Sequence, residues 1–134
     1  MSGCTLHLTL PIPPSVNHCY QQTVTRAGRR VPVLTTTAKK WIAAAQNIAY
    51  QEMNRTGWVP PEKTKVLFEY TVYWPDHRRR DPSNIVKVML DALCAKTKDR
   101  GGILMDDDQF CMERCMGIEY DKDDPRVEVK VMRA

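Results

Sequence analysis

Apolar and polar residues alternate along three stretches of the chain, and each alternation predicts a β-strand with one buried face. In residues 4–10 the apolar side comprises Cys4, Leu6, Leu8 and Leu10. In residues 65–74 it comprises Val66, Phe68, Tyr70, Val72 and Trp74, and in residues 126–132 it comprises Val127, Val129 and Val131. Residues 110–120 predict a further strand.

Two other segments repeat their apolar residues at helical spacing. The first predicted helix is capped by the threonines that open residues 35–54, and it places Trp41 in the core rather than on the surface. The second covers about residues 84–95. Asp81 can cap its first turn because proline, which follows, is tolerated at the first helical position; Ser83 is an alternative cap.

The elements follow in the order strand, helix, strand, helix, strand, strand. This order predicts an α+β fold in which two main helices pack on one face of a small, mixed, largely antiparallel sheet. The length fits one domain over residues 1–134. Prolines within residues 11–14 predict a fixed, irregular loop, and residues 20–34 predict either a hairpin or a mobile loop.

The composition, with 43% hydrophobic residues, is sufficient for a packed core. No apolar run is long enough to cross a membrane, and no charged-then-apolar leader opens the chain. We therefore expect a cytoplasmic protein that has no membrane partner. The five cysteines form no CxxC pair, which argues against a disulfide framework or a four-cysteine zinc site.

Charge is distributed unevenly along the chain. Residues 1–98 carry 14 Lys and Arg against 6 Asp and Glu, whereas residues 99–134 carry 6 against 10. A basic surface beside an acidic patch is what a metal-dependent nuclease requires, because cations hold the phosphate backbone and carboxylates hold the metal. A solvated charge pattern without a partner is the alternative.

One face of the second predicted helix collects its polar side chains. At about 100° per residue, Asn84, Lys87 and Asp91 fall within about 60° of one another, opposite an apolar arc. Asp81 lies at the mouth of this stripe, directly after the arginine triplet of residues 78–80. Because Lys87 and Asp91 are one turn apart, they could equally form a simple ion pair.

A run of aspartates, residues 106–108, follows a glycine pair. Mutual repulsion restricts such a run to a solvated turn or to a place where a cation neutralises it. If the run packs beside the start of the second helix, its carboxylates converge with Asp81 and Asp91. Hard oxygen ligands suit Mg²⁺, with Mn²⁺ as the alternative, and Lys87 could then steady the phosphate.

The segments LTLPIPPSVNHCY, PDHRRRDPSNIVKVMLDAL and DDDQ together resemble the RusA family of Holliday junction resolvases, which are small proteins of bacteria and their phages. The resemblance covers most of the chain, although its specific motifs occupy only part of it. It implies a homodimeric endonuclease that depends on a divalent metal and cuts branched, four-way DNA by paired nicks in recombination and repair. No nucleotide cofactor is expected.

Position by position, the resemblance implies catalytic roles for Asp81, Lys87 and Asp107. The implied metal ligands are Asp81, Asp91, Asp106 and Asp107, and Asp107 is the stronger catalytic candidate of the downstream pair. Arginine side chains suit phosphate contacts. DNA contacts are therefore predicted for Arg26, Arg29, Arg30, Arg78, Arg79 and Arg80, together with Asn84.

One position departs from the family pattern, because the second aspartate of D-x-D-N is replaced by Ser83. A serine hydroxyl is neutral and a weaker Mg²⁺ ligand, so either activity is reduced or Asp106 or Asp108 takes its place. The alternative function is therefore a module that binds DNA junctions with reduced or lost cleavage. A third possible function is that of a protein-interaction domain with an acidic surface patch.

Overall fold

The computed structural model describes residues 5–60, 64–94 and 111–133. Its strands are β1 (Thr5–Leu10), β2 (Tyr20–Val24), β3 (Arg30–Leu34), β4 (Val66–Trp74), β5 (Cys111–Tyr120) and β6 (Arg126–Arg133). Its helices are the 3-10 turn η1 (Val16–His18), α1 (Thr36–Thr56) and α2 (Ser83–Leu93). The predicted strands and helices are thus confirmed within a few residues, and the region of residues 20–34 is a hairpin.

Four strands form the main sheet, in the order β1-β6-β4-β5. β6 pairs antiparallel with both β1 and β4, so that Val129 lies opposite Leu8 on one side and opposite Tyr70 on the other. β5 pairs parallel with β4, and the register shifts after Tyr70. Two helices therefore accompany a mixed, largely antiparallel sheet, which confirms the predicted α+β class.

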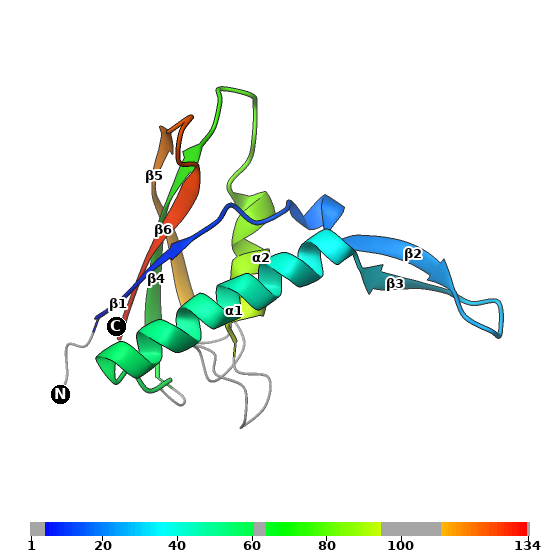
Figure 1. Cartoon of the computed structure of the whole chain (residues 1–134), viewed down its shortest axis with the longest axis horizontal. Coiled ribbons are helices and arrows are strands. Elements are labelled where there is room, and N and C mark those ends of the chain that lie inside the picture. The colour runs from blue at the N-terminus through cyan, green and yellow to red at the C-terminus, as the bar shows by residue number, and fades with distance from the viewer. Residues whose placement is uncertain (1–4, 61–63, 95–110, 134) are drawn as a thin grey trace.

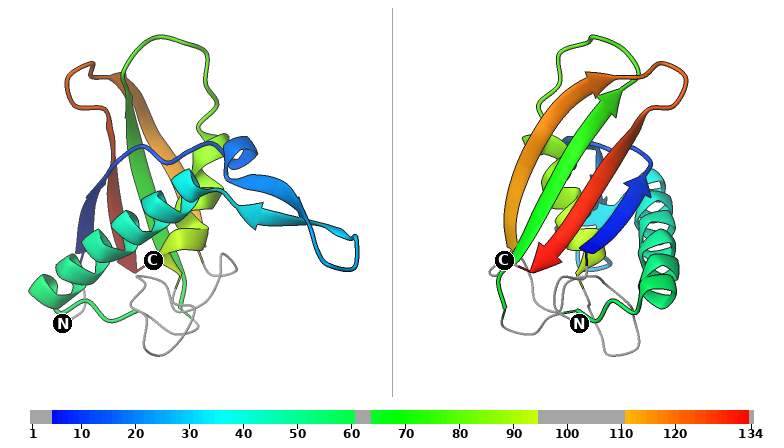
Figure 2. Two further views of the ribbon diagram at one scale, coloured as in Figure 1. Left: turned by 45° about the vertical axis from the view of Figure 1, so that its right-hand side comes forward. Right: turned by 90° about the vertical axis from the view of Figure 1, so that its left-hand side faces the viewer.

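Both long helices cover the same face of this sheet (Figure 2, right). The alternating residues of β1, β4 and β6 point into the core there: Leu6, Leu8, Leu10, Val66, Phe68, Tyr70, Val72, Trp74, Val127, Val129 and Val131 are all buried. The predicted apolar arc of α2 is buried against them, from Ile85 to Leu93. No helix within the described part of the chain is long and apolar enough to cross a membrane.

Helix α1 has the ends that its sequence predicts. The Thr35 hydroxyl accepts a hydrogen bond from the Ala38 backbone N–H at 3.2 Å, which caps the first turn. Gly57 ends the helix in the left-handed region, at a φ of 77°, where glycine is favoured. Trp41 is buried, as predicted, and its indole N–H donates to the Pro11 carbonyl at 2.8 Å. The helix therefore fixes the loop that follows β1.

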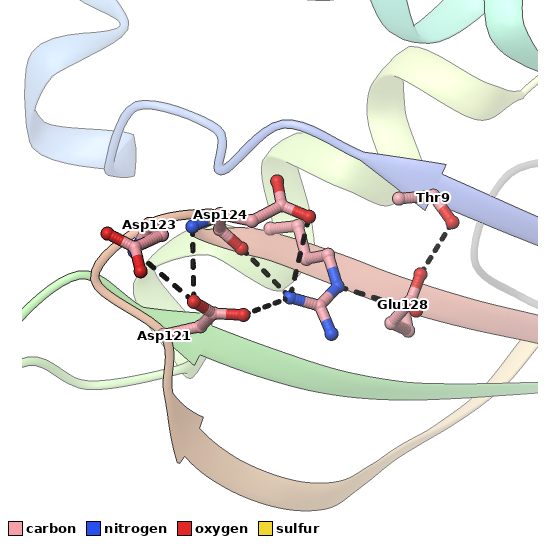
Figure 3. Close-up of polar contacts among 6 residues, drawn as sticks. Thr9, Asp121, Asp123, Asp124 and Glu128 are labelled. Atoms are coloured by element: carbon pink, nitrogen blue, oxygen red, sulfur yellow. Dashed lines mark hydrogen bonds and ion pairs between the residues drawn. The ribbon is translucent and has the colours of Figure 1, made fainter.

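The turn between β5 and β6 is held by Arg126, whose neighbours are drawn in Figure 3. Its guanidinium lies 2.9 Å from Asp121 and 3.5 Å from Glu128, and it stacks on the Tyr73 ring at 3.9 Å from the centroid. The Asp121 backbone N–H donates to the Trp74 carbonyl at 2.8 Å. This cluster therefore fixes the end of β4, from which the next segment leaves the sheet.

Candidate functional site

A cleft of about 470 Å³ lies where the loop after β1 faces the segment that leads from β4 into α2. The loop contributes Ile12, Pro13, Ser15, Asn17 and His18. The opposite side comprises Trp74, Arg78, Arg79, Arg80, Asp81, Asn84 and Ile85. The structure thus brings the predicted residues Asp81, Asn84 and the arginine triplet together around one concave surface.

Asp81 stands at the entry to α2 with an exposed carboxylate. Its Oδ1 accepts a hydrogen bond from the Ser83 backbone N–H at 3.0 Å, and its backbone carbonyl accepts from Asn84 N–H at 3.0 Å. Helix α2 begins at Ser83 with Pro82 in the N-cap position and without a side-chain cap there, so Asp81 accepts the first helical N–H from one residue farther upstream than predicted. The Ser83 backbone N–H, followed by the Ser83 hydroxyl, holds the pKa of the Asp81 carboxyl below its usual range. The carboxylate is therefore negatively charged near neutral pH.

Arg80 is tied into the protein rather than presented to solvent. Its guanidinium lies 2.7 Å from Asp76 Oδ1 and donates to the Asp76 carbonyl at 3.2 Å. It also lies over the Trp74 ring, 5.0 Å from the centroid, and its side chain is only 21% exposed. These contacts make Arg80 a support for the 76–80 turn, a role that the sequence prediction of a DNA contact did not include.

Arg78 and Arg79 are the exposed members of the triplet. The Arg78 side chain is 80% exposed and lies 3.4 Å from Asp76, a weak, solvent-screened contact. Within the described residues, Arg79 forms no hydrogen bond or ion pair. Two cationic side chains beside the cleft are therefore available to an anionic ligand.

We expect the 76–80 turn to loosen in acid. The Arg80 side chain, followed by the Arg78 backbone N–H, holds the pKa of the Asp76 carboxyl well below its usual range. A depressed pKa means that the contact stabilises the fold above the ordinary value of about 3.9 and is lost as pH falls through the lower, folded value. The NMR chemical shift of the Arg78 amide should therefore show an acid transition whose midpoint lies well below pH 4. In Asp76→Asn this transition should be absent; if it persists, another group causes it.

Lys87 and Asp91 lie farther along α2 and outside the lining of this cleft. Both are exposed, and Lys87 Nζ is 3.7 Å from Asp91 Oδ1. The ion pair anticipated as the simpler alternative is thus present. Within the described residues, no group of three or more His, Cys, Asp or Glu side chains is placed to hold a metal ion. Asp106, Asp107 and Asp108 lie outside the described residues, so their convergence with Asp81 stays a prediction.

Residues 12–18 were not predicted to line the site, although the cleft includes five of them. In the structure, His18 and Ser15 are paired there, with 2.7 Å between His18 Nδ1 and Ser15 Oγ, and Asn17 is exposed beside them. The prolines predicted a fixed loop, which is what the structure shows, but they carry no information about what the loop faces. The quoted LTLPIPPSVNHCY motif was the available signal.

Arg26, Arg29 and Arg30 lie on the β2–β3 hairpin, which extends away from the rest of the protein (Figure 1). The hairpin is antiparallel, with Tyr20 opposite Leu34 and Val24 opposite Arg30. At its base, the Thr35 backbone N–H donates to the Cys19 carbonyl at 2.8 Å. Because Cys19 directly follows the cleft residue His18, these arginines belong to a projection that begins at the cleft.

Comparison with known proteins identifies the family of this chain. A search of curated proteins returned no match. A family model described as Endodeoxyribonuclease RusA matches residues 11–132, which include the loop after β1, the arginine triplet, Asp81 and α2. Because the match spans nearly all of the chain, this protein belongs to the RusA family of endodeoxyribonucleases.

Proposed function

We propose that this protein is a metal-dependent endonuclease that resolves four-way DNA junctions by paired phosphodiester hydrolysis and acts as a homodimer. Membership of the RusA family supports a nuclease that acts on Holliday junction DNA. The observation that carries the proposal is the cleft, in which the charged Asp81 carboxylate lies beside exposed Arg78 and Arg79. An anionic backbone and a cation-binding carboxylate would thus meet at one place.

The arginine side of the cleft suits a phosphodiester backbone. Among the residues that the structure describes, none forms a hydrogen bond or ion pair with the Arg79 guanidinium, and Arg78 can exchange its weak contact with Asp76 for a phosphate. Arg80 holds the turn in place through Asp76 and Trp74, so the two exposed arginines are carried by a fixed backbone. Fixed cations orient the DNA strand and place its scissile bond near Asp81.

The donor chemistry of Asp81 fits a hard divalent cation. Mg²⁺ usually takes one or two carboxylates and completes its shell with waters and phosphate oxygens. Asp81 is exposed at the cleft and ionised, and we propose Asp106 and Asp107 as its partners on the grounds of sequence. Asp91 was also predicted as a ligand, but it lies more than two turns farther along α2, paired with Lys87, and is too distant from Asp81 to share its cation. A bound Mg²⁺ or Mn²⁺ would supply an activated water and offset the charge that develops on the phosphate. Lys87 is proposed to neutralise the leaving oxygen.

Ser83 uses its backbone N–H and hydroxyl to stabilise the charge on Asp81. In this position it supports a carboxylate rather than adding a second one. A chain with one carboxylate fewer at this helix start would bind the cation less tightly, which favours the second candidate function, a junction-binding module with reduced or lost cleavage.

A homodimer is proposed because paired nicks in two strands require two active sites related by a twofold axis. The decisive experiment is incubation of the wild-type protein with a synthetic four-way junction, with Mg²⁺ and then with excess EDTA. We expect paired nicks that require the metal, and little cutting of linear duplex. Salt-sensitive junction binding without product in Mg²⁺ or Mn²⁺ would instead establish the binding module. Failure to retain junction DNA at all would refute both DNA functions.

Arg79 and Arg80 should respond differently to replacement by glutamine. Arg79→Gln should weaken junction binding and lower the slope of log affinity against log salt concentration by about one, because one phosphate contact is lost. Its thermal stability should not change. Arg80→Gln should lower Tm, because the contacts with Asp76 and Trp74 disappear.

Lys130→Gln provides the matched control for this pair. Lys130 is exposed on β6 and belongs to the sheet face opposite the helices, since its neighbours Val129 and Val131 point into the core. The Lys130→Gln substitution should leave unchanged both Tm and the slope of log affinity against log salt concentration. If Arg79→Gln and Lys130→Gln weakened binding equally, the cleft would have no special role in holding DNA.

A further inference from the structure

The β2–β3 hairpin, residues 20–34, forms an arm that extends from the protein (Figures 1 and 2). Every residue of β2 is exposed, including Tyr20 at 52% and Val24 at 64%. An isolated two-stranded hairpin is marginally stable in water, so an arm of this kind is expected to gain contacts from a ligand. Its charge and geometry indicate which ligand that is.

The arm is exclusively basic. Its charged residues are Arg26, Arg29 and Arg30, and Lys39 and Lys40 follow in the first turns of α1. The first acidic residue of the whole chain is Glu52, far beyond the arm. A polyanion complements this surface, and under the proposed function the available polyanion is the DNA substrate.

The tip of the arm is an ordered turn. The Gly28 N–H donates to the Thr25 carbonyl at 2.9 Å, and the Thr25 N–H donates to the Arg29 carbonyl at 2.8 Å. Gly28 has a φ of 81°, a conformation that favours glycine. The turn therefore presents Arg26 in a defined position at the far end of the arm.

The dimensions of the arm match a DNA groove. Five residues per strand extend about 17 Å at about 3.3 Å per residue. The major groove of B-DNA is about 12 Å wide and about 8.5 Å deep, and it admits a two-stranded β-ribbon. The arm also has suitable side chains for base edges, because arginine pairs with guanine and glutamine with adenine, and Gln22 is exposed on β2.

The base of the arm is anchored to the cleft. Thr35 donates its backbone N–H to the Cys19 carbonyl at 2.8 Å and its hydroxyl to the His18 carbonyl at 3.1 Å. His18 lines the cleft, and the same Thr35 hydroxyl caps α1. A duplex whose backbone lies in the cleft would therefore meet the arm in a fixed orientation.

We propose that the arm enters the major groove of one duplex arm of the substrate and reads base edges with Arg26 and Gln22. This inference rests on the proposed function and adds a source of sequence preference to it. The arm would thus restrict which junctions, or which positions in a junction, are cut efficiently. Arg29 and Arg30 would contact the phosphates that border the groove.

The test is cleavage of four-way junctions whose duplex arms carry randomised sequence, read by sequencing of the products in Mg²⁺. The wild type should prefer particular bases within one duplex arm. In Arg26→Ala, the ratio of rates at favoured and disfavoured sequences should fall by about 5-fold to 140-fold, the range expected for loss of one bidentate base contact. Arg26→Lys keeps the charge, so it should lose the preference but retain the salt dependence.

A chemical probe identifies the groove. Replacing the favoured guanine by 7-deazaguanine removes the N7 acceptor of the major groove and should slow the wild type part of the way to the rate of Arg26→Ala, because the O6 acceptor remains. The variant itself should be insensitive to this replacement. Gln22→Ala should behave in the same way with 7-deazaadenine, and Lys130→Ala should retain the wild-type preference.

Several outcomes would overturn the inference. Cleavage by the wild type with a base preference that Arg26→Ala and Gln22→Ala both retain would refute it and leave the proposed function intact. If the wild type were insensitive to both 7-deaza bases, the inference would also be refuted and the proposed function would remain intact. If the variants instead changed the molar mass in light scattering, with base preference unaltered, the arm would serve a second copy of the chain. Absence of junction binding by the wild type would refute the proposed function itself.

Discussion

Replacing Asp81 with asparagine is expected to reduce junction cleavage by at least about 100-fold while the fold and junction binding remain. Asparagine caps a helix as well as aspartate does, so the side-chain oxygen can still accept the Ser83 N–H at the start of α2. The substitution therefore removes the negative charge without removing the local structure. Rates on a synthetic junction in Mg²⁺, with binding measured in Ca²⁺, separate the two effects.

Asp123→Asn is the matched control for this substitution. Asp123 is an exposed residue of the β5–β6 turn, and its backbone N–H, which the substitution leaves in place, donates to Asp121. Asp123→Asn removes one negative charge, as Asp81→Asn does, and this variant should cut junctions at the wild-type rate. Equal rates for Asp81→Asn and the wild type would exclude Asp81 from the reaction and leave the cleft as a binding surface only.

Phe68→Ala should destabilise the protein by about 3–5 kcal/mol, the range for truncating a fully buried aromatic side chain. Phe68 is 0% exposed on β4, between β6 and β5, on the face that the helices cover. A loss of this size approaches the whole stability of a small domain, so much of the variant should be unfolded at ambient temperature. Urea denaturation followed by circular dichroism measures the free energy of unfolding.

Leu67→Ala tests whether the effect belongs to the covered face. Leu67 is the neighbour of Phe68 on β4, points to the opposite side of the sheet and is only partly buried. Its truncation should cost less than about 1.5 kcal/mol. If both variants lost the same stability, the two faces of the sheet would be equally buried, contrary to the arrangement described here.

Much of this architecture could be predicted from local patterns. The alternation in residues 66–74 identifies β4 because it is buried on one face, and the threonine and glycine at the ends of α1 identify that helix by its caps. β5 is harder to assign, because most of its residues are exposed and its pattern changes where the register shifts. Its parallel pairing with β4 depends on the long connection between them, which no local pattern encodes.

The candidate site was likewise predictable where a local sequence pattern marks it, and not where it depends on packing between distant segments. Asp81 and the arginine triplet were identifiable because they adjoin a helix start, which the sequence marks by capping chemistry. Contacts through space were not identifiable in that way. The commitment of Arg80 to Trp74 and the position of residues 12–18 opposite the triplet depend on how the sheet and α2 pack. The convergence of Asp107 with Asp81 remains a prediction of the sequence.

Thr35 performs two tasks with one hydroxyl group, since it accepts from Ala38 and donates to His18. Both anchors of the hairpin, Cys19 and Thr35, lie outside the fifteen-residue ribbon of residues 20–34. The ribbon is therefore an exchangeable cassette: another sequence or another length could be grafted between these two points without disturbing the helix start. Homologous resolvases could diversify their substrate choice by this route, and an engineer could do the same.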